Sequence, residues 1–276
     1  GDYVRFRFSN VFGDRPLTLD KVGVALADTG AATVPGSHRE VTFDGSTSVT
    51  IPAGQEVWSD PVEFKVEDDV PLAVSTYVSG QTGPTTWHMR SSQTTYFAPT
   101  GDFVDSADAG PYRLEQDSWY WISGAEVVTD DPNARVIVAL GDSITDGAGS
   151  SVNTNNRWPD HLDHLLKETY PDANIAVLNA GISGNRVIGN SDNQGESALN
   201  RLQRDVFSHA GVTDIILLEG INDIGNVDGL QVEQLTDAYK TIAEQAHEKG
   251  IRIIGATLTP FRGFAEGYFT EEKELK

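Results

Sequence analysis

The chain has 276 residues, enough for one large domain or two, and it contains no cysteine. Disulfide bonds, thiolate metal sites and a cysteine nucleophile are therefore excluded. The formal net charge of −21 disfavours binding to nucleic acid or to anionic membranes. No apolar run approaches the ~20 residues that a membrane-spanning helix needs, so we expect no membrane insertion.

Residues 1–128 alternate apolar and polar side chains in many short runs, the period of half-buried β-strands. In the first run, Val4, Phe6 and Phe8 alternate with Arg5 and Arg7. Similar runs occupy residues 22–26, 49–51, 62–66 and 72–78, with turn signals such as Asp44-Gly45 between them. We predict an all-β accessory domain over residues 1–128, with a sandwich or jelly-roll-like fold.

Four tryptophans lie in this first half, at Trp58, Trp87, Trp119 and Trp121. Aromatic side chains on a β-sandwich can stack on sugar rings, but they more often pack in the core or on a sheet face. His88, beside Trp87, is either a surface residue or a contributor to a neighbouring site. Both interpretations stay open for the tryptophans and for the histidine.

Residues 129–134 are polar, include a proline and lie between two apolar strands, so we interpret them as a linker. After them, short apolar runs alternate with segments of helical spacing. The apolar runs cover residues 136–140, 175–178, 215–218 and 251–254, and the helical segments cover 158–166, 199–206 and 235–246. Alternation of this kind predicts a second domain over residues 135–276, with a parallel sheet and helices on both faces.

A polar, glycine-containing loop follows each of the first three predicted strands. The loops are Gly141-Asp142-Ser143, residues 179–186 and residues 219–223. Because the carboxyl ends of parallel strands meet at one edge of the sheet, we expect these three loops to lie close together there.

Three residues in these loops fit an acyl-transfer site. Ser143 offers a hydroxyl nucleophile, Gly184 a backbone N–H that no Cβ covers, and Asn222 a side-chain amide that can donate to an oxyanion. Taken singly, each has a structural explanation. Ser143 suits a helix N-cap, Gly184 a turn, and Asn222 an Asx-type turn.

Taken together, the loops resemble the SGNH hydrolase superfamily, also called GDSL esterases and lipases. Gly141-Asp142-Ser143-Ile144 is similar to its first block, Gly184 to its second, and Gly220-Ile221-Asn222-Asp223 to its third. The G-x-S-x-G elbow of α/β-hydrolases is absent, because Thr145 stands where the second glycine would be. Residues 157–160 and 257–260 further resemble a bacterial branch that carries an N-terminal β-module.

The resemblance implies a flavodoxin-like sheet and a serine esterase or acylhydrolase that works through an acyl-enzyme. Ser143 is the implied nucleophile, and its N–H, the Gly184 N–H and the Asn222 side chain form the implied oxyanion hole. Asp142, Asn185 and Asp223 are expected to support the site. No cofactor and no metal are implied. The implied substrates are small acyl esters, including acetyl groups on polysaccharide.

The sequence departs from the family at its fourth motif, Asp-x-x-His, which supplies the catalytic base and the acid that orients it. None of the six histidines matches that motif, and His161 and His164 read as one face of a helix. We therefore expect the base and its aspartate to lie outside this chain, which would make the domain C-terminally incomplete. A second polypeptide carrying Asp-x-x-His is one expected partner, and the chain alone is expected to be weak or inactive.

Two other functions fit the sequence. Asp142, Glu219 and Asp223 offer carboxylates for a glycosidase. Alternatively, the β-domain binds carbohydrate and the protein is not catalytic. The acidic composition suits a secreted or extracytoplasmic location.

Overall fold

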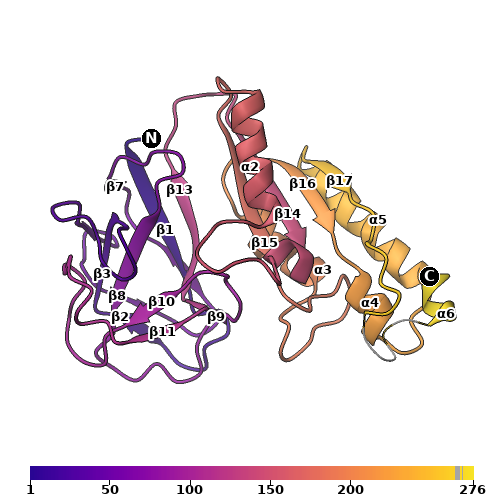
Figure 1. The fold of residues 1–276 in the computed structure, drawn as a ribbon, viewed down its shortest axis with the longest axis horizontal. Helices are drawn as coiled ribbons and strands as arrows, with labels where there is room; N and C mark the ends of the chain where they lie inside the picture. The colour runs from indigo at the N-terminus through magenta and orange to yellow at the C-terminus, as the bar shows by residue number, and fades with distance from the viewer. Residues whose placement is uncertain (265–267, 269) are drawn as a thin grey trace. The chain divides into compact units, whose positions relative to one another are not determined.

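The computed structural model describes residues 1–264, 268 and 270–276. It divides the chain into two compact units, Gly1–Asp130 and Asp131–Lys276, and each is described here by itself (Figure 1). Among the described residues, none of the helices combines the length and the apolar character that crossing a bilayer requires.

All the regular elements of the first unit are strands. They are β1 (Tyr3–Ser9), β2 (Leu17–Leu19), β3 (Lys21–Leu26), β4 (Arg39–Val41), β5 (Val49–Ile51), β6 (Glu56–Trp58), β7 (Val62–Glu63), β8 (Leu72–Tyr77), β9 (Trp87–His88), β10 (Thr95–Phe97), β11 (Leu114–Gln116), β12 (Trp119–Tyr120) and β13 (Ile122–Val127). Every pairing between them is antiparallel. One sheet has the order β13-β1-β6, with β7 also paired to β1, and another has the order β4-β3-β8.

These two sheets contribute to one hydrophobic core. Phe6 and Phe8 of β1 pack in the same buried cluster as Val22 and Val24 of β3 and Val41 of β4. The apolar positions of the alternating runs therefore face a shared interior, as the period of two requires. The sandwich or jelly-roll arrangement itself stays a prediction.

Arg7 departs from simple alternation, because its side chain is buried although its neighbours Phe6 and Phe8 fill the core. Its Nε donates to Ser123 Oγ over 3.0 Å, and its guanidinium lies 5.5 Å from the centre of the Trp58 ring. The same ring lies 4.6 Å from the guanidinium of Arg5. The Trp58 ring thus covers the arginine side chains on the polar face of β1. Packing within this unit therefore explains why Trp58 is half-buried.

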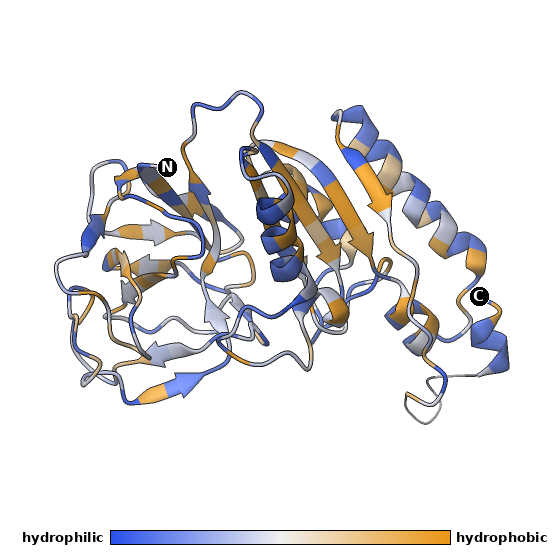
Figure 2. Ribbon diagram, turned by 45° about the horizontal axis from the view of Figure 1, so that its top comes forward, coloured by the Kyte–Doolittle hydropathy of each residue, from blue (hydrophilic) through white to orange (hydrophobic). Residues whose placement is uncertain are grey.

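The second unit is built on a parallel sheet of four strands. They are β14 (Arg135–Gly141), β15 (Ile175–Gly181), β16 (Val212–Leu218) and β17 (Arg252–Gly255), in the order β15-β14-β16-β17. The first strand is therefore central and the chain reverses direction across the sheet beside it, which is the flavodoxin-like order. Figure 2 shows that these strands are mostly hydrophobic, as expected for strands buried on both faces.

Helices and short turns connect these strands. They are α1 (Ser143–Asp146), α2 (Trp158–Thr169), α3 (Ala198–Leu202), the π-helical turn η1 (Gln203–Phe207), α4 (Ile221–Asn226), α5 (Val232–Glu248) and α6 (Glu271–Glu274). The segment predicted as one short helix over residues 199–206 is therefore split between α3 and η1.

Different helices pack against the two faces of this sheet. Val138 and Leu140 of β14 pack with Leu202 of α3 and Ile242 of α5 in one buried cluster. Ile137 and its neighbours at alternate positions point to the opposite face, where α2 lies against β15. The carboxyl edge of the sheet, between these layers, carries the three predicted loops.

Candidate active site at the carboxyl edge of the parallel sheet

Ser143 begins α1 immediately after β14 ends. The helix is a single turn that stops at Gly147, whose φ of 100° lies in the left-handed region that favours glycine. Gly141 is equally constrained, because a Cβ there would lie 2.5 Å from the carbonyl oxygen of Leu218. The Ser143 side chain is half-buried, and neither its hydroxyl nor its N–H is hydrogen-bonded to any other described residue. Both groups are therefore available to a substrate.

Asp142 is the N-cap of α1, and its Oδ1 accepts from the Ile144 N–H over 2.9 Å. Its other carboxylate oxygen is buried and has no hydrogen-bond partner among the described residues. Burial, assisted by the negative charge of Asp223, raises the pKa of Asp142 to about 6. The structure thus places Asp142 where it shapes the turn beneath Ser143.

Gly184 lies in the loop after β15, with a φ of 81°. Its neighbour Ser183 donates to Asp146 Oδ2 through both its N–H, over 2.8 Å, and its hydroxyl, over 2.6 Å. The N–H of Ile182 donates to the carbonyl oxygen of Gly141 over 3.0 Å. These bonds tie the Gly184 loop to the α1 turn. The Gly184 N–H itself has no acceptor in the part of the chain that the structure describes.

Asn222 is the second residue of α4 and is nearly buried. Its Nδ2 donates to the carbonyl oxygen of Asn185 over 3.0 Å, which joins the third loop to the residue next to Gly184. The Tyr268 hydroxyl donates to Asn222 Oδ1 over 3.0 Å and so orients the amide with its N–H groups on the other side. One of the two amide N–H groups is left to donate elsewhere.

Asp223 and Asn185 are both buried and hold the loops in place. Asp223 accepts from the N–H groups of Val187 and Ile188 over 2.8 and 3.0 Å. The Asn185 amide donates to the carbonyl oxygens of Gln194 and Glu196, each over 2.8 Å. Both side chains thus bond to backbone groups of the loop, which suits a supporting role.

Sequence reasoning missed three polar side chains beside the site. Arg201, Tyr239 and Tyr268 contact its loops. Arg201 and Tyr268 belong to no motif, and the helical spacing that includes Tyr239 predicts only a packed helix face. The Tyr239 hydroxyl donates to the carbonyl oxygen of Glu219 over 2.7 Å. Burial is the main cause that raises the pKa of Tyr268 to about 12, so this phenol keeps its proton at neutral pH.

Glu219 has only 2% of its surface exposed, and its carboxylate oxygens have no hydrogen-bond partner among the described residues. Burial is the main cause that raises the pKa of Glu219 to about 8, against the opposing charge of Arg201. Asp142 and Asp223 each have 0% of their surface exposed. A glycosidase needs carboxyl groups that reach the sugar on both sides of the scissile bond. The burial of all three argues against that chemistry here.

The six histidines lie elsewhere in the chain. His38 and His88 belong to the first unit, and in the second unit His161 and His164 lie on α2, His209 follows η1, and His247 is in the last turn of α5. The ring of His161 is hydrogen-bonded to Asn156 Oδ1 over 2.6 Å. No hydrogen bond within the described ranges joins a histidine to Ser143. Among the described residues of the second unit alone, no three histidine or carboxylate side chains gather closely enough to bind a metal ion.

Residues 139–275 match the family model of the GDSL-like lipase/acylhydrolase family. No curated protein matches the chain. Similar solved structures include AlinE4, an SGNH-hydrolase family esterase, at 24% identity, a carbohydrate acetylesterase family member from Sinorhizobium meliloti at 17%, and the aryl esterase of M. smegmatis at 17%. The match to AlinE4 covers 50% of this chain and 67% of AlinE4. The matches to the acetylesterase family member and to the aryl esterase each cover 44% of this chain, and 61% and 63% of those proteins, respectively. Each match has a TM-score of 0.38.

The matched region begins inside β14, three residues before Asp142, and includes all three loops of the site. Through its second unit, the chain belongs to the GDSL-like lipase/acylhydrolase family of the SGNH hydrolase superfamily.

Proposed function

We propose that the protein is a serine esterase that cleaves small acyl esters through an acyl-enzyme. The observation that supports this most is the chain of contacts around Gly184. The residue before it, Ser183, is bonded to α1, and the residue after it, Asn185, accepts from Asn222. The three implied oxyanion donors are thereby held on one connected framework, which is what stabilisation of a tetrahedral intermediate requires.

In this mechanism the Ser143 oxygen attacks the ester carbonyl carbon, and its proton passes to a base. The developing oxyanion accepts from the N–H groups of Ser143 and Gly184 and from the amide of Asn222. The carbon–oxygen bond to the alcohol then breaks, and the alcohol leaves with the proton. In the second half of the reaction the base activates a water molecule, which attacks the carbonyl carbon of the acylated serine. The same N–H groups stabilise the oxyanion, the acid is released and the serine hydroxyl is restored.

We propose that the base is a histidine of an Asp-x-x-His pair outside residues 1–276, on the same or a second polypeptide. Within the proposed substrate class, we propose acetyl groups on polysaccharide. Trp87 and Trp119 support this extension, because 49% and 40% of their surfaces are exposed on the first unit, where sugar rings can stack on them. A secreted or extracytoplasmic location is proposed with it.

The decisive experiment measures hydrolysis of p-nitrophenyl acetate by the wild type, Ser143→Ala and Asn222→Ala, with and without added imidazole. Ser143→Ala is expected to abolish enzymatic hydrolysis, and Asn222→Ala to lower kcat about 10²- to 10³-fold. If the base lies elsewhere, imidazole should accelerate the Ser143-dependent rate, whereas it should add only its own background reaction to Ser143→Ala.

Ser150→Ala is the matched control, because this half-buried serine follows α1 without belonging to the proposed machinery. Acetate release from an acetylated polysaccharide tests the substrate. Activity that survives Ser143→Ala contradicts the esterase mechanism. Glycan binding without any Ser143-dependent hydrolysis would instead favour a carbohydrate-binding protein.

A further inference from the structure

Arg201 is a fully charged side chain in the interior of the second unit. It lies on α3 with 1% of its surface exposed and is among the largest fully buried side chains of the described residues. Removing a guanidinium from water costs several kcal/mol unless its N–H groups are all engaged. The hydrogen-bond partners of Arg201 therefore show which parts of the second unit this buried side chain stabilises.

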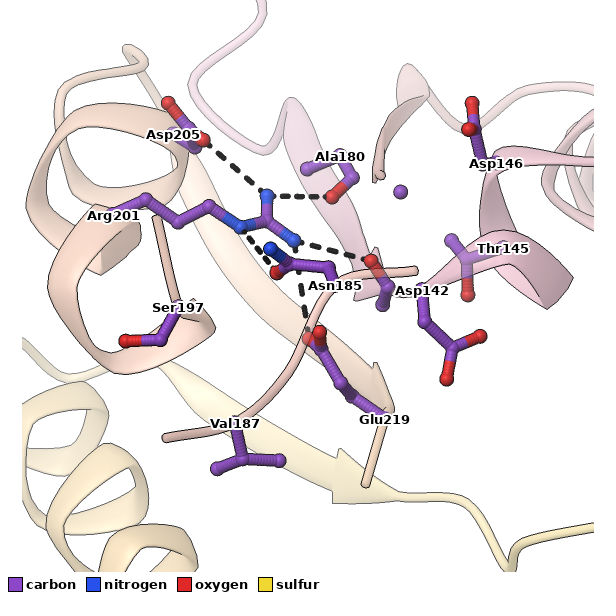
Figure 3. Close-up of polar contacts among 12 residues, drawn as sticks. Asp142, Thr145, Asp146, Ala180, Asn185, Val187, Ser197, Arg201, Asp205 and Glu219 are labelled. Atoms are coloured by element: carbon purple, nitrogen blue, oxygen red, sulfur yellow. Dashed lines mark hydrogen bonds and ion pairs between the residues drawn. The ribbon is translucent and has the colours of Figure 1, made fainter. Parts of the chain in front are cut away.

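Two of those contacts are with the backbone at the ends of neighbouring strands. Nη2 donates to the carbonyl oxygen of Gly141 over 3.1 Å. Nη1 donates to the carbonyl oxygen of Ala180 over 2.7 Å (Figure 3). Gly141 directly precedes the Asp142-Ser143 turn, and Ala180 is the second-last residue of β15, after which the chain enters the turn that carries Gly184. One side chain thus holds the starting points of two loops of the site.

A third contact extends to the last loop. Arg201 Nε donates to Asn185 Oδ1 over 3.0 Å, and the carbonyl oxygen of Asn185 accepts from Asn222. Asn185 therefore lies between the guanidinium and the oxyanion asparagine. Arg201 is hydrogen-bonded to Gly141, close to Ser143 in the chain, and to Asn185, which is next to Gly184 and accepts from Asn222.

The charge of Arg201 is balanced by the carboxylate of Asp205, and the carboxyl group of Glu219 lies near it on another side. Asp205, one helical turn away, has its Oδ2 3.3 Å from Nη1, and Glu219 has its Oε2 3.9 Å from Nη2 (Figure 3). The guanidinium thus donates four hydrogen bonds, to Gly141, Ala180, Asn185 and Asp205, whereas Glu219 lies beyond hydrogen-bond distance. A lysine at this position has three rotatable donors and cannot reproduce a planar fork of five.

We propose that Arg201 is a positioning residue for the oxyanion hole, holding Ser143, Gly184 and Asn222 in register through their loops. This inference rests on the esterase function proposed above. An error of about 1 Å in such a framework lowers the rate about 10²-fold, although no group in contact with substrate has been removed. A residue that only stabilises the fold would affect the unfolding temperature and leave the site intact.

The test compares Arg201→Lys with Arg204→Lys. Arg204 is the matched control, because it lies in the adjoining turn and forms ion pairs with Glu196 and Asp205. For each folded variant, kcat and KM for p-nitrophenyl acetate are measured well below the unfolding temperature. The affinity for a boronic acid, which forms a tetrahedral adduct on the serine, is measured beside them. Imidazole is included wherever the wild type requires it.

Arg201→Lys is expected to lower kcat and boronic acid affinity about 10- to 100-fold, with KM changed less than about threefold. Arg204→Lys should leave all three near wild-type values. If Arg201→Lys does not fold, Asn185→Ala takes its place, because it removes the acceptor of Nε and keeps the buried charge. The same selective loss is then expected.

The outcomes separate the two proposals. If Ser143→Ala is inactive while a folded Arg201→Lys, or Asn185→Ala in its stead, keeps wild-type kcat and boronic acid affinity, the positioning role is wrong and the esterase stands. If the wild type shows no Ser143-dependent activity with or without imidazole, the esterase proposal fails and the role of Arg201 fails with it.

Discussion

Glu219 shows how one residue beside the site can carry a cost in stability. Its carboxyl group is buried without a hydrogen-bond partner among the described residues, 3.9 Å from the nearer guanidinium nitrogen of Arg201. Because burial disfavours the charged form, Glu219 keeps its proton in the folded protein until its pKa of about 8. In the unfolded chain it ionises near its ordinary pKa of 4.5.

This difference predicts how the free energy of unfolding depends on pH. Between pH 4.5 and about 8, the unfolded chain has released the proton and the folded chain has not. Stability therefore falls as pH rises, by at most about 1.4 kcal/mol for each unit of this window. Glu219→Gln cannot ionise, so its stability relative to the wild type should rise steadily from pH 5 to pH 8.

Denaturant unfolding at several pH values measures this difference. Glu244→Gln, at an exposed position on α5, is the matched control for the loss of a carboxyl group at the surface. A stability difference between Glu219→Gln and the wild type that is independent of pH would show that Glu219 is ionised in the folded protein.

At the scale of the elements, the start of α4 depends on a glycine. Gly220 has a φ of 122°, and a Cβ there would lie 2.1 Å from the hydroxyl oxygen of Tyr239. That hydroxyl is not free to move, because it donates to the carbonyl oxygen of Glu219. The strand end, the α4 turn and α5 are therefore packed too closely for any side chain at position 220.

Gly220→Ala is accordingly expected to destabilise the protein more than Gly229→Ala. Gly229 also has a positive φ, of 71°, but open space surrounds its Cβ position. Backbone strain alone costs about 1–3 kcal/mol, and the clash with Tyr239 adds to it. In a Tyr239→Phe background the cost of Gly220→Ala should shrink, because the clashing oxygen is gone. Equal costs for the two alanine variants would show that the close contact does not govern this turn.

The three strand ends show how far a sequence pattern reaches at this scale. Parallel strands align their carboxyl ends, so the spacing of apolar runs was enough to predict that the loops of Ser143, Gly184 and Asn222 converge. The pattern could not predict that residues 203–207 leave the α-helix, because a π-helical turn differs from an α-helix by one residue of hydrogen-bond spacing.

At the scale of the whole molecule, each unit has its own hydrophobic core. Phe8 is fully buried in the first unit and Ile242 in the second. All the described helices belong to the second unit, whereas Trp158 is the only tryptophan outside the first. Tryptophan fluorescence therefore reports mainly on the first unit, and the helical signal in far-ultraviolet circular dichroism on the second.

We predict that core substitutions act on one unit at a time. Phe8→Ala should cost about 3–5 kcal/mol and lower the midpoint seen by fluorescence, and Ile242→Ala should cost about 2–5 kcal/mol and lower the midpoint seen by circular dichroism. Urea titrations followed with both probes make the comparison. Both midpoints moving together in either variant would mean that the units unfold as one.

The sequence by itself determined the alternation of four strands with the longer helices in the second unit and the turns that bear Ser143, Gly184 and Asn222, because periodicity and glycine-flanked turns are local signals. The short helices α1 and α4 left no periodic signal. Only the tertiary structure decided that Arg201, Tyr239 and Tyr268 support those loops and that Glu219 is buried. Arg201 and Gly141 are 60 residues apart in the chain, and a contact over such a separation leaves no periodic trace. The same reason applies to Arg7, whose burial depends on Trp58 and Ser123 rather than on its place in an alternating strand.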